Sequence, residues 1–157
     1  SRFFISDWDD RKVYLARREG DRFVVEKEAS FAPAHPAGVI WTGSRLYMIA
    51  WTRGLGTKFE LVEMDASFTV LNTYRIRNIH EPSQLAWDGK DLWISSWYSK
   101  AIYRVDPSRM KISGSFPSPV PLPTGIVWDG NYMWLTGTYS DLYQLEIMAG
   151  EAPPGAR

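Results

Sequence analysis

The chain of 157 residues contains no cysteine, and that absence excludes several kinds of chemistry. Without thiols there is no disulfide framework, no thiolate metal site and no catalytic cysteine. The sequence also lacks any apolar run close to the ~20 residues that a membrane-spanning helix requires, and it shows no targeting segment. We therefore expect a soluble protein without a membrane partner, while the cellular compartment stays open.

An excess of charge of one sign is missing as well. Lysine plus arginine and aspartate plus glutamate each number 18, so the formal net charge is zero. Proteins that bind nucleic acid usually carry a basic excess, and we expect no nucleic-acid partner here. The sequence also contains none of the short motifs of serine hydrolases, phosphate-binding loops, dinucleotide sites or zinc proteases. Enzymes of those classes are therefore not indicated.

Aromatic residues are abundant instead, and they recur in a repeated motif. The chain has eight Trp, eight Tyr and seven Phe, and the leading residues Trp41, Trp87 and Trp128 of three similar segments are 46 and 41 positions apart. A period of this length is typical of stacked supersecondary units, such as propeller blades or solenoid coils. The three segments read Ile-Trp-Thr-Gly-Ser-Arg-Leu-Tyr (40–47), Ala-Trp-Asp-Gly-Lys-Asp-Leu-Trp (86–93) and Val-Trp-Asp-Gly-Asn-Tyr-Met-Trp (127–134).

Each complete repeat is predicted to contain four short strands, called a to d, because alternating apolar residues are separated by turn residues. The Asp-Gly pair at 88–89 is the signal of a tight hairpin. The first repeat lacks strand a, and the fourth ends at strand c. The predicted strands are 2–8, 12–16 and 22–31; 38–41, 46–51, 59–65 and 69–76; 83–87, 92–97, 101–106 and 111–116; and 125–128, 132–139 and 141–147.

Four short antiparallel strands per repeat describe a β-propeller blade, so the predicted fold class is all-β. A two-sheet sandwich is the alternative, but a sandwich would not require this period with fixed Trp positions. The repeat aromatics are expected in the core between blades, namely Trp41, Trp87, Trp128, Tyr47, Trp93 and Trp134. The expected organisation is an incomplete blade at 1–36, blades at 37–82 and 83–124, an incomplete blade at 125–148 and a flexible tail at 149–157.

A further regularity is carried by Pro-Thr-Gly-Ile-Val-Trp-Asp-Gly (123–130), Leu-Trp-Ile-Ser-Ser-Trp (92–97) and Ala-Ile-Tyr-Arg-Val-Asp-Pro (101–107). These segments resemble the repeats of the NHL, YVTN and SMP-30-like group of β-propellers, which includes virginiamycin B lyase and glutamine cyclotransferase relatives. The resemblance covers most of the chain and implies a propeller fold. It implies no single activity, because the group contains enzymes, sensors and scaffolds. Neither the metal ligands of SMP-30 enzymes nor a lyase catalytic set can be placed on this sequence.

About four repeats amount to a half-ring, since propellers of this group usually have six or more blades. An open half-ring would expose blade faces rich in Trp and Leu. Two chains related by a two-fold axis would close a ring of eight blades. We therefore expect a homodimer that completes the ring; the alternative is that the chain is a fragment of a longer protein.

The unusual side chains gather on one predicted face of the repeats. In a four-stranded antiparallel blade, the b–c turns and the connections from strand d to the next strand a lie on the same face. Loop insertions on one face of a repeat protein often build its binding surface. The candidate ligand-binding residues are Trp8, Trp51, Trp97 and Tyr139 at the ends of strand b, Arg53 in the long connection 52–58, His35, His80 and Glu81 in d–a connections, and Gln84 at the start of an inner strand.

Aromatic rings beside His, Glu and Arg suit stacking on a sugar, a heterocycle or a cation. The alternatives are that each ring packs between blades and that each His fastens its own loop by hydrogen bonds. The acidic group Asp7, Asp9 and Asp10 offers oxygen ligands for a divalent cation, but its spacing fits a solvated hairpin turn better.

The sequence favours a non-enzymatic scaffold that binds a small molecule, a glycan or a protein on this loop face, with no cofactor. The alternative hypothesis is a metal-dependent lyase or hydrolase of the virginiamycin B lyase or SMP-30 kind. That hypothesis uses His35 or His80 as a general base beside a divalent cation. It rests on likeness of fold and on two histidines sharing one face.

Overall fold

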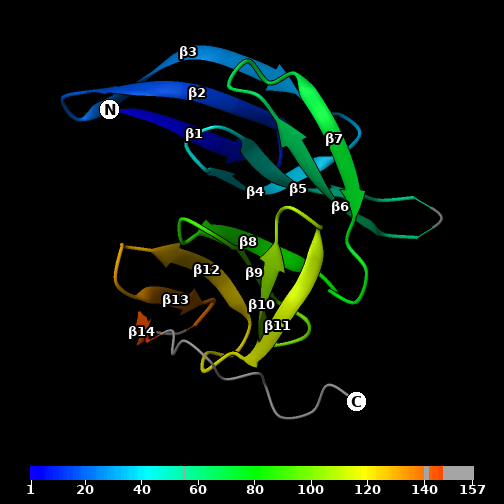
Figure 1. Cartoon of the computed structure of the whole chain (residues 1–157). Coiled ribbons are helices and arrows are strands. Elements are labelled where there is room, and N and C mark those ends of the chain that lie inside the picture. Colours follow the sequence, from blue (N-terminus) through cyan, green and yellow to red (C-terminus); the bar gives the residue numbers. More distant parts are fainter. Residues whose placement is uncertain (55, 140–141, 147–157) are drawn as a thin grey trace. The chain divides into compact units, whose positions relative to one another are not determined.

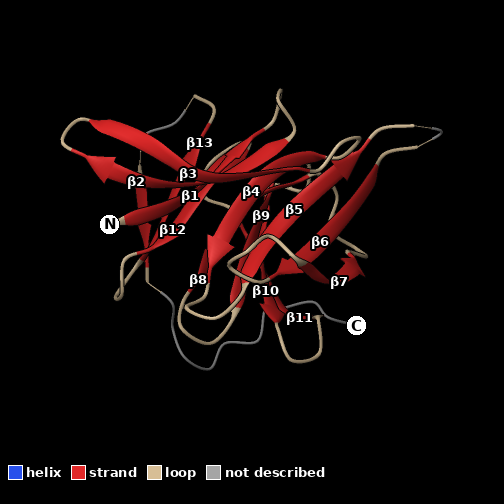
Figure 2. Cartoon of the chain, turned by 90° about the horizontal axis from the view of Figure 1, so that it is seen from above, coloured by secondary structure: helices blue, strands red, loops and turns tan. Residues whose placement is uncertain are grey.

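The computed structural model describes residues 1–54, 56–139 and 142–146. These residues form fourteen strands and no helix. Figure 2 shows strands and loops alone, so the all-β prediction is confirmed. No helix long and apolar enough to cross a membrane occurs among them. The predicted tail at 149–157 lies outside the described residues.

The chain divides into two compact units, Ser1–Ile76 and Arg77–Arg157, called here the N-terminal and the C-terminal unit. Each unit holds two antiparallel sheets whose strands follow one another in chain order (Figure 1). The N-terminal unit contains the sheet β1 (Arg2–Asp7), β2 (Lys12–Glu19) and β3 (Arg22–Ser30), and the sheet β4 (His35–Trp41), β5 (Leu46–Thr52), β6 (Lys58–Met64) and β7 (Val70–Arg75).

The C-terminal unit repeats this plan. One sheet has four strands and the other has three, each strand paired antiparallel with its neighbour in the chain. The strands are β8 (Pro82–Trp87), β9 (Leu92–Ser96), β10 (Ala101–Asp106) and β11 (Lys111–Pro117), followed by β12 (Pro123–Trp128), β13 (Met133–Gly137) and β14 (Tyr143–Leu145). Four antiparallel sheets of three or four strands are what the repeats predict.

The strand bounds differ from the predicted ones in two informative places. Strand β4 begins at His35 rather than at residue 38, because His35 pairs with Trp51 across the sheet. His35 therefore lies at the start of an inner strand, and the prediction that placed it in a connecting loop is wrong. Strand β2 continues to Glu19 rather than ending at residue 16, because it pairs with β3 up to Arg22.

Each unit is held together by the apolar faces of its two sheets. In the N-terminal unit, Val13 of β2 meets Leu46, Met48 and Met64 of the next sheet, and all four side chains are fully buried. Phe4 and Trp41 pack against the same cluster. Burial of each large apolar side chain stabilises a fold by about 1.5–3 kcal/mol, so this cluster is the main support of the unit.

The C-terminal unit has an equivalent cluster between its two sheets. Ile102 and Trp93 from one sheet meet Ile126 and Leu135 from the other. Trp128 and Phe116 pack against them from the side, as Trp41 does in the N-terminal unit. The prediction that Trp41, Trp93 and Trp128 belong to the core between sheets is confirmed.

The repeated Asp-Gly motif forms a four-residue turn that also holds a tryptophan. One carboxylate oxygen of Asp88 accepts hydrogen bonds from the backbone N–H of Lys90 and Asp91, at 2.8 and 2.7 Å. The other oxygen accepts the indole N–H of Trp93 at 2.7 Å. Gly89 has a φ of 96°, a region that L side chains rarely adopt, which explains glycine at this position.

The fourth repeat contains the same set of hydrogen bonds, and the second repeat contains part of it. Asp129 accepts two backbone N–H groups and the indole N–H of Trp134, at 2.6 Å. The bond from Trp134, followed by the backbone bonds, lowers the pKa of Asp129. In the second repeat, Thr42 accepts from the backbone N–H of Arg45, and Tyr47 occupies the tryptophan position. The motif is therefore a hairpin fastener rather than part of a binding site.

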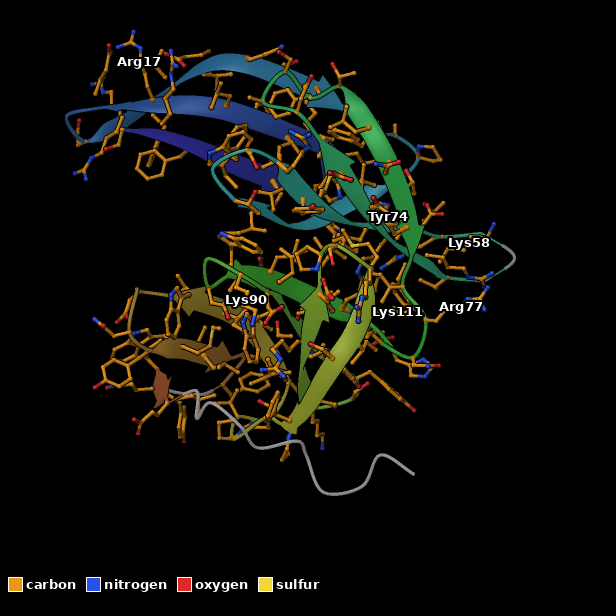
Figure 3. All side chains as sticks on the ribbon, in the orientation of Figure 1. Arg17, Lys58, Tyr74, Arg77, Lys90 and Lys111 are labelled. Atoms are coloured by element: carbon orange, nitrogen blue, oxygen red, sulfur yellow. The ribbon has the colours of Figure 1, made fainter. Side chains whose placement is uncertain are left out.

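A polar cluster fastens the outer strand β7 to β6 (Figure 3). The carboxylate of Glu63 accepts from Tyr74 at 2.8 Å and from Asn72 at 2.9 Å, and it faces Arg45 at 3.3 Å. Burial and then the bond to Glu63 raise the pKa of Tyr74 to about 12. Although burial alone would raise the pKa of Glu63, the hydrogen bonds from Asn72 and Tyr74 lower it.

The bonds of Asp88 predict that two substitutions at this position lower the free energy of unfolding by different amounts. Asp88→Ala removes all three bonds and is expected to lower the free energy of unfolding by about 1–3 kcal/mol. Asp88→Asn keeps the acceptor for the backbone but presents an N–H to the indole N–H, so a smaller loss of about 1 kcal/mol is expected.

Urea unfolding curves check the order of these two losses. Asp21→Ala is the matched control, because Asp21 lies in another turn with its side chain 97% exposed, and it is expected to change stability by less than about 0.5 kcal/mol. Equal stability of Asp88→Ala and of the control would contradict the role given to the Asp88–Trp93 bond.

Candidate functional site

Three segments of the N-terminal unit bring aromatic side chains together at one end of its strands. Trp8 follows β1, His35 begins β4, and Trp51 lies near the end of β5. His35 and Trp51 are cross-strand partners, so the pairing of β4 with β5 places them side by side. Trp8 belongs to the other sheet of the unit and reaches them from the β1–β2 turn.

The rings form a continuous stack. Trp8 stacks on His35 with ring centroids 4.7 Å apart and an interplanar angle of 28°, and it meets the edge of Trp51 at 5.3 Å. Trp51 in turn contacts Phe59, its cross-strand partner on β6, at 4.7 Å. The guanidinium carbon of Arg53 lies 5.8 Å from the centre of a Trp8 ring. These five residues, together with Arg11, are called the Trp8 cluster below.

Both ring nitrogens of His35 have partners. Nδ1 lies 3.0 Å from the carbonyl oxygen of Trp8, which accepts only, so Nδ1 carries the proton. Nε2 then has a lone pair, and it accepts the Nε–H of Arg11 at 3.4 Å. The geometry therefore defines a neutral His35 that fastens the β1–β2 turn to the start of β4.

The acidic residues around Trp8 are occupied by the turn itself. Asp7 accepts the backbone N–H of Asp10 at 2.9 Å, and Asp10 accepts the hydroxyl of Tyr14 at 3.3 Å. Burial and then the negative charge of Asp10 raise the pKa of Tyr14. No three His, Cys, Asp or Glu side chains gather as possible metal ligands anywhere in the described part of the chain. The spacing argument for a solvated turn agrees with these bonds.

A second group of predicted residues comes together in the C-terminal unit. The backbone N–H of Trp97 donates to the carbonyl of Glu81 at 3.0 Å, and the hydroxyl of Ser96 donates to the carbonyl of His80. The His80 ring meets the edge of Tyr98 at 6.2 Å. Glu81 has a φ of 46°, in the left-handed region. Its Oε2 atom is buried without a hydrogen-bond partner among the described residues.

Tyr139 and Gln84 are the remaining predicted residues of this unit. Tyr139 follows β13 and is 89% exposed, whereas Gln84 lies within β8 opposite Ser95. Trp97 is 40% exposed. The four aromatic residues that the repeat pattern makes equivalent are therefore unequal. Trp8 and Trp51 are half-buried in one stack, while Trp97 and Tyr139 present open rings.

The sequence-based candidates omit three residues of these groups: Arg11, Phe59 and Tyr98. Phe59 was recoverable, because counting the register of the β5–β6 hairpin places it opposite Trp51. Tyr98 directly follows Trp97 in the sequence. Arg11 had no sequence signal, since its contact with His35 depends on a φ of 54° at Arg11 and on the packing of two sheets.

A hollow of about 500 Å³ lies toward the opposite ends of the strands of the N-terminal unit. It has no counterpart among the predicted sites, and its one charged residue, Arg2, already pairs with Glu26 at 2.8 Å. The hollow is lined by Arg2, Phe3, Phe4, Leu15, Val39, Ile40, Trp41 and Ala66.

Several solved structures share this fold at low sequence identity. A nidogen/laminin complex matches with a TM-score of 0.66 and 12% identity, covering 87% of this chain and 52% of that one. A catalytically inactive virginiamycin B lyase from Staphylococcus aureus, solved with quinupristin, matches with a TM-score of 0.56 and 18% identity, covering 92% and 51%. A mitotic checkpoint complex matches with a TM-score of 0.58 and 21% identity, covering 91% and 44%.

The fold class follows from these matches together with the four sheets. The chain has a β-propeller fold that resembles virginiamycin B lyase and related propellers, as the repeats predict. It spans about half the length of the solved structures that it matches. No family model matches the sequence, and no curated protein matches it.

The geometry of His35 predicts one tautomer. At neutral pH, a long-range ¹H–¹⁵N spectrum is expected to show protonated Nδ1 and unprotonated Nε2, because Trp8 offers an acceptor and Arg11 a donor. Assignment is direct, since the chain has two histidines. Arg11→Ala is expected to shift the Nε2 signal, whereas the control Arg22→Ala, whose side chain is 87% exposed, is not. A His35 ring protonated at Nε2 alone would contradict this arrangement.

Proposed function

We propose that this chain is a non-enzymatic propeller scaffold that binds a ligand or partner on the face formed by its b–c turns and d–a connections. The observation that carries the proposal is the Trp8 cluster. Three segments from two sheets converge there on a stack of aromatic rings beside an exposed guanidinium group. Large rigid rings next to a cation are frequent in binding sites, because they offer contact area at low cost in conformational entropy.

The ligand classes that suit this surface are small molecules, glycans and proteins. Half-buried indole rings with polar neighbours suit stacking on sugars or heterocycles. A protein partner is supported by the occurrence of similar propellers in complexes, namely those of nidogen with laminin and of the mitotic checkpoint. In the C-terminal unit, the open Trp97 ring and the neighbouring His80 and Glu81 lie at the corresponding b–c and d–a connections of that unit.

The alternative function is that of a metal-dependent lyase or hydrolase. Its support is the fold shared with virginiamycin B lyase, together with His80, whose ring is exposed beside Glu81. Against it stands His35, because a general base needs a free lone pair and Nε2 of His35 accepts from Arg11. The scaffold is therefore the better-supported proposal.

Fluorine NMR of 5-fluorotryptophan-labelled chain tests the proposed face with a panel of neutral glycans, heterocycles and organic acids. A ligand of this face is expected to shift the Trp8 and Trp51 signals selectively and to leave that of the core residue Trp128 unchanged. Trp8→Phe, which assigns its signal, is expected to weaken binding about 2–10-fold through reduced ring contact.

Two outcomes would argue against the scaffold. If no panel member moves the Trp8 and Trp51 signals, the face does not bind these classes of ligand. If the purified chain retains a stoichiometric divalent cation and a turnover that His80→Ala abolishes, the enzyme alternative is supported instead. Binding that persists in EDTA is the result expected for the scaffold.

We also propose that a second copy of the chain completes the ring. The chain spans about half of virginiamycin B lyase and of the nidogen/laminin match, and among the described residues the first sheet has three strands, with β1 paired to β2 alone. An unpaired strand edge favours association with another chain.

Light scattering coupled to size-exclusion chromatography measures the state in solution. One chain has a mass of 18.0 kDa, and a species of twice that mass is expected. A single-chain mass that persists at high protein concentration would contradict the homodimer. The binding proposal would stand, because the Trp8 cluster is complete within one N-terminal unit.

A further inference from the structure

Arg53 is positioned by the hairpin that carries it. Strands β5 and β6 pair Trp51 with Phe59 and Thr52 with Lys58 (Figure 1). Side chains alternate along a strand, so Trp51, Phe59 and Arg53 share one side of the hairpin while Lys58 lies on the other. The contact of Trp51 with Phe59 and the position of Arg53 over Trp8 agree with this alternation.

The stack holds the guanidinium of Arg53 without neutralising its charge. A guanidinium group over an indole face is attracted by the ring quadrupole, which orders the side chain before any ligand arrives. Trp8 is itself fixed, because it contacts His35 and Trp51. Arg53 is thus an ordered cation at an exposed position.

The charges of Arg53 and Arg11 have no carboxylate partner within residues 1–54 and 56–76. Some other arginines of the N-terminal unit pair with acids: Arg2 and Arg17 with Glu26, and Arg45 with Glu63. Arg53 instead lies over the Trp8 indole, and Arg11 donates a hydrogen bond to the His35 ring. Most guanidinium N–H donors at this end of the unit therefore face solvent.

We propose that Arg53, supported by Arg11 across the Trp8–His35 stack, is the binding site for a carboxylate group. The planar fork of a guanidinium matches a carboxylate in a bidentate pair, and an aromatic or apolar group attached to that carboxylate would lie against Trp51 and Phe59. This inference rests on the proposed function and names its ligand class, an organic acid with an apolar body.

The acidic turn beside the site narrows the choice of anion. Asp7, Asp9 and Asp10 lie next to Trp8 in the sequence, and none of them forms an ion pair with Arg53 or Arg11. Their negative charges repel a polyanion, such as a nucleic acid or a phosphate dianion, more strongly than a single carboxylate. A monoanion is therefore the class that fits both the guanidinium pair and the acidic turn.

The test compares two probes of nearly equal shape, benzoate and the neutral benzamide, followed through the ¹⁵N signals of the arginine Nε–H and tryptophan Nε1–H groups. Benzoate is expected to shift the Arg53 and Trp8 signals to saturation, and benzamide is not. Arg53→Lys keeps the charge but loses the fork, and it is expected to weaken benzoate binding several-fold. Arg53→Ala is expected to weaken it by roughly tenfold or more.

Lys58→Ala is the matched control, because Lys58 carries the same charge and the strand register places it on the other side of the same hairpin. This variant is expected to bind benzoate like the wild-type chain. Equal losses in Lys58→Ala and Arg53→Ala would overturn the proposal, because the effect would then be unspecific attraction. Backbone ¹H–¹⁵N spectra establish that each variant is folded, and Arg53 lies outside the core, so loss of folding is not expected.

Two peptides identify the source of the carboxylate, and the wider panel distinguishes failure of the carboxylate proposal from failure of the scaffold proposal. An acetylated Phe-Glu-Phe amide and its Gln counterpart distinguish an acidic side chain of a protein from a free organic acid as the source of the carboxylate. If a neutral ligand of the wider panel shifts Trp8 and Trp51 while benzoate and the Glu peptide do not, the carboxylate proposal fails and the scaffold stands. If nothing shifts these signals, both proposals fail.

Discussion

The structure depends on one constraint: a four-stranded sheet buries its apolar face only if a second sheet covers it. In the N-terminal unit, Val13 from one sheet closes over Leu46 and Met48 of the other, and all three side chains are fully buried. Because side chains alternate along a strand, this burial fixes the register of both sheets. A slip by one residue would turn the buried set toward solvent, so the strand ends are fixed as firmly as the core.

The candidate site follows from those fixed ends. Trp8 and Trp51 belong to different sheets, yet their rings meet at 5.3 Å because the cores behind them hold the two strands in place. A site built on strand ends is more precise than one built on long loops, since little entropy remains to be lost when a ligand binds. Arg53 is the first residue after β5, so the fixed end of that strand also places Arg53 over the stack.

The sequence predicts the elements well, because turns and alternation are local signals. The Trp-x-Gly motif places strand b of the second, third and fourth repeats, and the contact of Asp88 with Trp93 explains why the motif recurs. Contacts between sheets are a different matter. The stacking of Trp8 on His35 depends on two segments 27 residues apart, and the pairing of His35 with Trp51 depends on the extension of β4 beyond its predicted start. Local sequence patterns contain neither of these contacts. The sequence therefore indicates Trp8, His35 and Trp51 as candidates but does not predict that they contact one another.

His35 and Arg53 show that the structure distinguishes roles that the sequence leaves open. A histidine in a loop serves equally as a base or as a fastener until its two nitrogens are located, and at His35 both are engaged. An arginine in a loop is ordinarily a solubilising charge, but Arg53 is ordered by an indole and keeps its donors for a partner. Function is therefore to be sought where the fold has fixed a group in place without satisfying it. By that criterion, we propose Arg53 rather than His35 as the centre of the candidate site.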